Sequence, residues 1–369
     1  MSFTIKGKIY SIAKEYLYFG MVVMFLGMAG VLLPQIYAGK SDTAKAVGST
    51  YTVCASDCDY TAIQSAIDAS SEGDTVTVGA TYELENDDTI SVSANRTLDC
   101  QNSGAVVGSS TSFSWMYSYA TSTVQNCTLE NVKVAVLGVN TEITSNTFNF
   151  NLDDPGCGDF IGLNNYDNVS FTSNAINASL DVFGCGSGGL VSMGSSDNID
   201  FSYNNIIFSS VSSSANLGYP ILVGRGDNLS ITNNYITQPE PGLAANVLKS
   251  IYVSSGNILN LDISHNTFYI REVSDGEAGI SIIDTGESAV ISVTSSYNLY
   301  YTDESYSGLL YGNHVTKSYN DSAVTINHGY NGYVGANTNL VTTGTYSGEI
   351  TTGVIGSDSF EDDAFFISS

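Results

Sequence analysis

The chain of 369 residues is poor in basic side chains. Lys and Arg together number 11 against 37 Asp and Glu, which gives a formal net charge of −26. Five of the basic residues precede residue 50: Lys6, Lys8, Lys14, Lys40 and Lys45. Proteins that bind nucleic acid neutralise its phosphates with Lys and Arg, so the composition argues against nucleic acid as a partner. An acidic surface instead favours solubility, cation binding or a saline habitat.

Beyond its N-terminal region the chain also lacks long stretches of helical periodicity. A phrase with Ile or Phe, an Asn three residues later and an apolar residue after that recurs instead, in steps of 28, 30, 30 and 32 residues: Asn146, Asn174, Asn204, Asn234 and Asn266. The segment from Val293 to Ser296 continues the series with serine in place of asparagine. Short alternating runs of β-branched and aromatic residues fill each repeat. This pattern predicts an all-β protein, a parallel β-helix with three short strands in each coil.

The recurring asparagine suits a bend of the coil for two reasons. Asn tolerates the left-handed backbone conformation, and its amide can bond to the same amide one coil away. We therefore expect the five asparagines in one column, within nine or ten coils between residues 76 and 350. A second column of apolar pairs supports the same register: Ile161 and Leu163, Val191 and Met193, Ile221 and Val223, Ile251 and Val253, Ile280 and Ile282.

The N-terminal region is the one long apolar stretch. Residues 17–37 are long enough for a transmembrane helix or for a signal peptide, and both alternatives stay open. The lysines within residues 1–16 predict that this segment stays cytoplasmic and that the chain after about residue 40 is exported. The expected organisation is a cytoplasmic segment (1–16), an anchor or signal peptide (17–37), a linker (38–50), a β-helix (51–355) and an acidic tail (356–369).

Six cysteines in an exported chain predict disulfides rather than zinc, since CxxC pairs and histidine partners are missing. Stacked coils bring residues 27 or 28 positions apart within disulfide range, and the two remaining cysteines close a local loop. The expected pairs are Cys157 with Cys185, Cys100 with Cys127, and Cys54 with Cys58. The alternative is a column of free buried cysteines.

Residues 59–84 read as a helix, a turn and a first strand. Ile63, Ala66 and Ile67 form an apolar stripe suited to covering the open end of a β-helix. The segment resembles the N-terminal cap of the right-handed parallel β-helix, or pectin-lyase-like, superfamily. It is also similar to the start of secreted archaeal surface β-helix proteins, in which a strand resembling residues 95–100 follows. The Gly-Ala-Thr-Tyr of residues 79–82 departs slightly from the usual Pro-Gly-Thr-Tyr. The resemblance implies a fold over residues 52–345, not an activity.

The enzymes of that superfamily match poorly. The clustered aspartates, Gly-His-Gly and Arg-Ile-Lys of polygalacturonase-like enzymes are not found together, and the arginines that a pectate lyase needs are well separated. The nearest similarity is to pectin methylesterases: residues 159–162 resemble their nucleophile segment and residues 224–226 their arginine segment. Asp159 and Arg225 are thus the candidate catalytic pair. The expected register places them roughly 20 Å apart, too far to act together.

Two further groups are candidates for binding. Asp153, Asp154 and Asp159 flank a Pro-Gly-Cys-Gly loop that could gather a calcium ion, the one cofactor considered; a solvated turn is the simpler interpretation. Aromatic rings alternate along residues 113–119 and crowd the C-terminal coils. Buried, the rings of residues 113–119 are core, which we favour; exposed, they would stack on sugars. The candidate sugar-stacking residues are Trp115, Tyr117, Tyr300 and Tyr301.

Together these features favour a non-catalytic cell-surface protein, displayed through its N-terminal helix in the membrane. It would act in adhesion, glycan contact or envelope structure, with cell-surface glycans or envelope proteins as partners. A polysaccharide lyase or hydrolase, or a pectin-methylesterase-like enzyme, is the main alternative. A third possibility is an extracellular filament subunit that self-assembles. The acidic surface would repel pectin-like polymers, so neutral sugars are the expected ligands.

Overall fold

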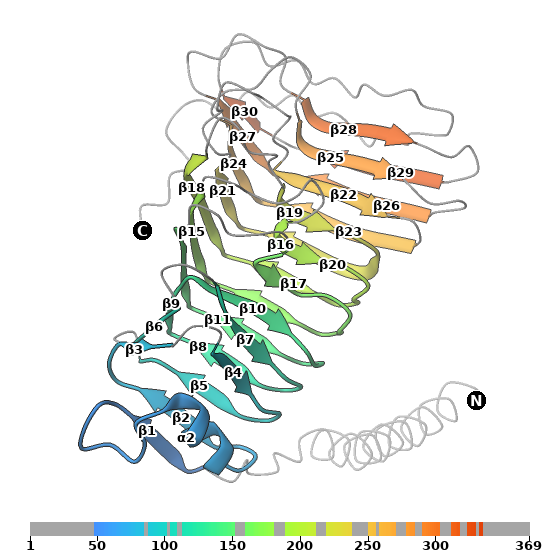
Figure 1. The fold of residues 1–369 in the computed structure, drawn as a ribbon. Helices are drawn as coiled ribbons and strands as arrows, with labels where there is room; N and C mark the ends of the chain where they lie inside the picture. Colours follow the sequence, from blue (N-terminus) through green and yellow to red (C-terminus); the bar gives the residue numbers. More distant parts are fainter. Residues whose placement is uncertain are drawn as a thin grey trace, which may run out of the picture. The chain divides into compact units, whose positions relative to one another are not determined.

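The computed structural model of the chain is an all-β parallel solenoid with very little helix (Figure 1). The structure describes residues 48–84, 88–101, 104–108, 113–151, 159–180, 189–211, 219–237, 250–255, 258–270, 278–284, 290–302, 311–317, 323–329 and 332–334. The chain passes repeatedly through three sheets, so that each strand pairs in parallel with the equivalent strand one coil away. The predicted parallel β-helix is confirmed.

In the described residues sheet 1 has 11 strands: β1 (Thr50–Val53), β2 (Thr75–Val78), β5 (Thr97–Asp99), β8 (Thr123–Gln125), β11 (Glu142–Thr144), β14 (Ser170–Thr172), β17 (Asp200–Ser202), β20 (Gly226–Thr232), β23 (Ile258–Ser264), β26 (Val290–Ser296) and β29 (Ala323–Gly329). Sheet 2, over the same described ranges, has 10: β3 (Tyr82–Glu83), β6 (Ala105–Val107), β9 (Thr128–Glu130), β12 (Thr147–Phe150), β15 (Ala175–Leu180), β18 (Asn205–Val211), β21 (Tyr235–Thr237), β24 (Thr267–Ile270), β27 (Leu299–Thr302) and β30 (Gly332–Val334). Sheet 3 has 9 described strands: β4 (Thr89–Val92), β7 (Ser114–Ser118), β10 (Val132–Val136), β13 (Ile161–Gly162), β16 (Gly189–Met193), β19 (Tyr219–Val223), β22 (Ile251–Ser255), β25 (Ala278–Asp284) and β28 (Tyr311–Lys317).

Among the described residues there is one helix, α2 (Ile63–Ala69), which lies beside β1 and β2 at the N-terminal end of the solenoid (Figure 1). Its apolar stripe of Ile63, Ala66 and Ile67 is buried and belongs to the core. No helix within the described residues is long and apolar enough to cross a membrane. The expected anchor or signal peptide (17–37) and the acidic tail (356–369) lie outside those residues.

The core is built from inward-facing columns, because strand side chains alternate and stacked coils keep them in register. The predicted apolar column is confirmed in sheet 3, where Val191 pairs with Ile221, Ile221 with Ile251, and Ile251 with Ile280. In sheet 1, the rings of Phe171 and Phe201 stack from one coil to the next, with centroids 5.2 Å apart. Each coil therefore buries the same positions as its neighbour.

The predicted asparagine column is also confirmed, at the first corner, between sheets 1 and 2. Each side-chain amide donates to the Oδ1 of the next asparagine at 3.0 to 3.2 Å. Each also donates to a backbone carbonyl of the previous coil, as Asn204 does to Phe171 O at 2.9 Å. We call this column the buried ladder: Asn146, Asn174, Asn204, Asn234, Asn266 and Asn298, all at most 2% exposed.

Two expectations about this ladder were wrong. The sixth member is Asn298, not Ser296, because the last step is again 32 residues and Ser296 pairs with Ser264 in the strand before the corner. The left-handed residue is not the asparagine but the one before it: Ser145 and Ser173 each have φ 57°. The ladder asparagine therefore serves through its side chain, which satisfies buried backbone groups, and not through its backbone conformation.

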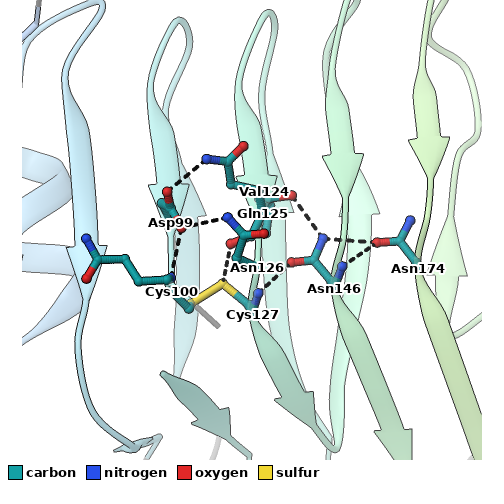
Figure 2. Close-up of a disulfide and its surroundings, with 9 residues drawn as sticks. Asp99, Cys100, Val124, Gln125, Asn126, Cys127, Asn146 and Asn174 are labelled. Atoms are coloured by element: carbon teal, nitrogen blue, oxygen red, sulfur yellow. Dashed lines mark hydrogen bonds between the residues drawn. A yellow bond between two sulfur atoms is a disulfide. The ribbon is translucent and has the colours of Figure 1, made fainter. Parts of the chain in front are cut away.

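A disulfide continues the buried ladder at its N-terminal side (Figure 2). The backbone N–H of Cys127 donates to Asn146 Oδ1 at 3.0 Å, as an asparagine of the ladder would, and Cys127 is bonded to Cys100 with their Cα atoms 4.7 Å apart. The Cys54–Cys58 disulfide is also present. These two predicted pairs are confirmed, whereas Cys157 and Cys185 lie outside the described residues.

The residue before Cys100 is held by several hydrogen bonds. Asp99 accepts hydrogen bonds from Gln125 Nε2 at 2.9 Å, from Asn126 Nδ2 at 3.0 Å and from the Gln101 N–H at 2.8 Å (Figure 2). Burial raises the pKa of the Asp99 carboxyl, but these hydrogen bonds together outweigh it and lower the pKa. The carboxylate thus fixes the turn that carries Cys100.

Candidate functional site

The structure does not bring the candidate catalytic pair together. Asp159 accepts from the Gly189 N–H at 3.1 Å and from Asn164 Nδ2 at 3.3 Å, whereas Arg225 Nε donates to Ser195 Oγ at 2.9 Å. Gly189 pairs with Tyr219, and Arg225 lies six residues further along the chain. At ~3.3 Å per residue that is about 20 Å, so a carboxylate at 159 and a guanidinium at 225 cannot act on one bond.

The candidate calcium site is only partly within the structure. Asp159 is described, and its two oxygens accept the hydrogen bonds just given. Asp153 and Asp154 lie outside the described residues. Among the residues that are described, no group of three or more His, Cys, Asp or Glu is placed to hold a metal ion.

The aromatic residues of β7 lie on the outer face of sheet 3. Ser114, Met116 and Ser118 are at most 1% exposed, whereas Trp115 and Tyr117, which alternate with them, are half-buried. The expectation that the rings of residues 113–119 form core is therefore wrong for Trp115 and Tyr117, whereas Phe113 packs against the core. The alternation points the small and flexible side chains inward and the rings outward. Trp115 and Tyr117 lie nearly parallel, with centroids 6.0 Å apart and planes at 15°.

A buried lysine of the next strand lies beside Trp115. Lys133 of β10 pairs with Trp115 and is 5% exposed. Its Nζ lies 4.7 Å from the centroid of Phe160, 4.8 Å from that of Phe113 and 5.6 Å from that of Trp115. Burial lowers the pKa of the Lys133 ammonium, and the negative charge of Asp159 opposes that shift. Cation–π attraction between the Lys133 ammonium and the rings of Phe113, Trp115 and Phe160 thus holds these side chains in a defined arrangement.

On its other side Trp115 borders small polar residues. Thr89 of β4 pairs with Trp115, and Ser91 pairs with Tyr117. Thr89 is exposed, and Ser91 is held by a hydrogen bond from its N–H to Gln64 Oε1 of α2 at 2.8 Å. Trp115 therefore lies between Lys133 and Thr89, and Tyr117 lies between Ala135 and Ser91. We call Trp115 and Tyr117 the β7 ring pair.

A second ring pair lies further along sheet 3. Tyr219 and Tyr252 are half-buried and stack with centroids 3.9 Å apart at 7°. Burial, and then the charge and the hydrogen bond of Tyr252, raise the pKa of Tyr219 to about 12. The phenols of both residues belong to one hydrogen-bonded unit.

Of the two C-terminal candidates, one is a core residue and the other is placed only by its strand. Tyr300 is fully buried and stacks on Phe268 with centroids 4.9 Å apart, so its proposed role in sugar stacking is wrong and it is a core residue. Tyr301 lies in β27, where it pairs with Tyr269 and with Val334. The error at Tyr300 follows from the error at Asn298: two residues after a ladder asparagine is always a core position, as Phe268 is after Asn266.

Sequence reasoning missed Lys133, Tyr219 and Tyr252 as parts of the outer face. The sequence signal for Lys133 is its alternation with the apolar Val132 and Val134, which places its side chain on the outer face once the strand is known. Tyr219 and Tyr252 do not occupy equivalent positions of their coils, since Tyr252 pairs with Leu222, and no motif marks them.

No protein-family model matches this chain, and no match is found among curated proteins.

Proposed function

We propose that this is a non-catalytic cell-surface β-helix protein that contacts neutral sugars through the β7 ring pair. The observation that carries the proposal is the alternation in β7, where residues of small or flexible side chain are buried and Trp115 and Tyr117 are turned outward. Large aromatic side chains gain most from burial, so their placement on the outer face favours a binding role.

The arrangement of the rings suits a sugar better than it suits catalysis. The two rings are nearly parallel, and Trp115 lies beside the buried Lys133, so the surface is ordered before a ligand binds and binding costs less conformational entropy. A sugar ring has an apolar face that can lie on such a surface while its hydroxyls meet Thr89 and Ser91. The strongly negative chain disfavours acidic polymers, and neutral sugars are the ligands that remain.

An extracellular position is the second part of the proposal. Disulfides persist in oxidising compartments, and the Cys54–Cys58 and Cys100–Cys127 bonds are consistent with one. The apolar residues 17–37 would export or anchor the chain. In line with its resemblance to pectin-lyase-like and archaeal surface proteins, α2 would close the N-terminal end of a right-handed solenoid.

The test is binding of the purified full-length chain to an array of neutral and acidic glycans. We expect binding to neutral glycans, and a loss of about tenfold or more for the Trp115→Ala/Tyr117→Ala variant. Val139→Ala removes an exposed apolar side chain elsewhere and should leave binding unchanged. Depolymerisation of a polyuronate by the wild type, lost in Asp159→Ala or Arg225→Ala, would overturn the proposal in favour of an enzyme.

A further inference from the structure

The first corner of the solenoid carries a second set of aromatic side chains, distinct from the β7 ring pair. Tyr203, His265 and Tyr297 each occupy the left-handed position directly before a buried-ladder asparagine, with φ of 58°, 59° and 56°. Tyr235 lies just past the same corner, at the start of β21. We call these four residues the corner aromatic row. Four successive coils contribute one ring each.

The backbone at this position does not favour aromatic residues. A left-handed conformation is easiest for Gly and Asn, and a bulky side chain there is strained. The equivalent residues of other coils are smaller: Ser145, Ser173 and Asn233. The strain is not offset by packing in the core, because the rings of Tyr203 and Tyr297 are 65% and 52% exposed. An exposed ring on a strained backbone suggests a role other than folding.

The row also concentrates the exposed apolar surface. Large apolar side chains that are exposed within the described residues number six, and three of them belong to the row: Tyr203, Tyr235 and Tyr297. The ring of His265 lies parallel to that of Tyr297, with centroids 5.0 Å apart and planes at 14°. The row is thus a ribbon of rings that follows the stacking direction, about 14 Å from the coil of Tyr203 to that of Tyr297 at ~4.8 Å per coil.

We propose that the corner aromatic row binds an extended, neutral polysaccharide chain that lies along the stacking direction. A polymer with a short repeat fits a surface that offers a ring in every coil, and each ring can take the apolar face of one sugar. The exposed carboxylates of Asp200 and Asp262 stand three residues before Tyr203 and His265, and they disfavour anionic chains, including nucleic acid and polyuronates.

A protein partner fits the row less well. Protein interfaces have a contiguous apolar centre surrounded by a polar rim. Here polar residues separate the rings along the row, with Asn233 between Tyr203 and His265 at the corner and Asn205 and Thr267 on either side of Tyr235. A narrow line of rings set in polar surface matches a single sugar chain.

The structure also provides a test that separates binding from folding. Asn occupies the corner position naturally at residue 233, so the Tyr203→Asn/His265→Asn/Tyr297→Asn variant removes three rings and relieves the backbone strain. We expect the variant to have an unchanged or higher midpoint of thermal unfolding. Its affinity for neutral hexasaccharides (cellohexaose, xylohexaose and mannohexaose) should fall about tenfold or more.

Matched controls use the same column. Ser145→Asn and Ser173→Asn make the same kind of exchange in coils without a ring at the corner, and they should bind as the wild type does. The weaker binding that remains in the Trp115→Ala/Tyr117→Ala variant should be lost when the three Asn substitutions are added to it, so failure at one site is distinguishable from failure at the other.

Three outcomes would overturn the proposal. The triple variant binding the hexasaccharides as tightly as the wild type would show that the rings make no contact with them. A clear fall in its midpoint of unfolding would show that the rings are structural. Absence of glycan binding by the wild type, together with self-association that the triple variant loses, would assign the row to a contact between copies of the chain.

Discussion

Two columns of asparagine run along the solenoid at similar spacing, one inside the first corner and one on the surface of the third corner, between sheets 3 and 1. The surface column consists of Asn168, Asn198 and Asn228, all exposed, and their side chains bond to one another at 3.0 and 3.1 Å. The buried ladder has the same amide-to-amide contacts at 3.0 to 3.2 Å. Amide-to-amide hydrogen bonds of similar length therefore occur both at the exposed surface and in the buried interior.

The backbone separates the two columns. In the surface column the asparagine itself is left-handed, with φ of 57°, 57° and 55° at Asn168, Asn198 and Asn228. In the buried ladder the preceding residue takes that conformation. At the surface, asparagine therefore serves because its backbone tolerates the left-handed conformation. In the buried ladder it serves because its side-chain amide bonds to buried polar groups. Substitutions should have different consequences in the two columns.

The largest effect should come from Asn204→Ala in the buried ladder. Asn204 donates to Phe171 O and to Asn234 Oδ1, and it accepts from the backbone and side-chain amides of Asn174. Its removal leaves several buried polar groups unsatisfied, so we expect a loss of roughly 3–5 kcal/mol in the free energy of unfolding. Urea unfolding of the purified chain measures it. A loss below about 1 kcal/mol would mean that water replaces the amide.

The next effect concerns the disulfide that continues the ladder. Replacing Cys100 and Cys127 by alanine opens a loop of 27 residues, and in the chain-entropy description this costs about 3.5 kcal/mol. The Cys54→Ala/Cys58→Ala variant opens a loop of 4 residues and should cost only about 2 kcal/mol. Both are measured by urea unfolding under non-reducing conditions. Equal losses would show that loop length does not decide the contribution at these sites.

A smaller effect is expected in the surface column. Asn198→Ala should cost about 1 kcal/mol, because alanine tolerates the left-handed conformation poorly, whereas Asn198→Gly should cost less than about 0.5 kcal/mol. The comparison of the two thermal midpoints checks this. If glycine costs as much as alanine, the exposed amide contacts matter more than the backbone, and the contrast between the columns fails.

The half-buried Tyr219–Tyr252 pair lies between the two extremes of burial. The pKa of Tyr219 is raised to about 12 in the folded protein, so the neutral phenol stabilises the fold below the ordinary pKa of about 10, and this contribution is lost as the pH rises through 12. Tyr252→Phe removes the partner's hydrogen bond and charge. We expect the ultraviolet titration of Tyr219 to move down toward pH 10, and an unchanged titration would leave burial as the sole cause.

The columns could be predicted because coil length hardly varies over the middle of the chain. A step of about 30 residues is visible in the sequence whether or not the corner geometry is known, and it also located Cys127 one coil after Cys100. The exact residue at the bend could not be predicted in the same way. The left-handed residue and the ladder asparagine are neighbours in every coil, as Ser173 and Asn174 are. Either order of the two would give the same period.

Where the coil lengthens, prediction from the period failed. The step from Asn266 to Asn298 is 32 residues, and assuming 30 moved the expected bend to Ser296. Counting from Asn298 places Tyr300 in the core beside Phe268, as the structure has it. The outward placement of Trp115 was missed for a different reason: the alternation fixes which residues share a face but not which face is inside, and serine at 114 and 118 gave no apolar signal.

The central claim is that buried columns hold the solenoid together while outward rings bind sugar. The most direct test measures two quantities, the free energy of unfolding and the affinity for a neutral glycan, on the wild type, Asn204→Ala and Trp115→Ala/Tyr117→Ala. We predict that Asn204→Ala lowers the free energy of unfolding and, under conditions where the variant is folded, keeps the affinity for the glycan. The Trp115→Ala/Tyr117→Ala variant should lose affinity and keep its stability. Loss of stability in the Trp115→Ala/Tyr117→Ala variant without loss of affinity would contradict the account.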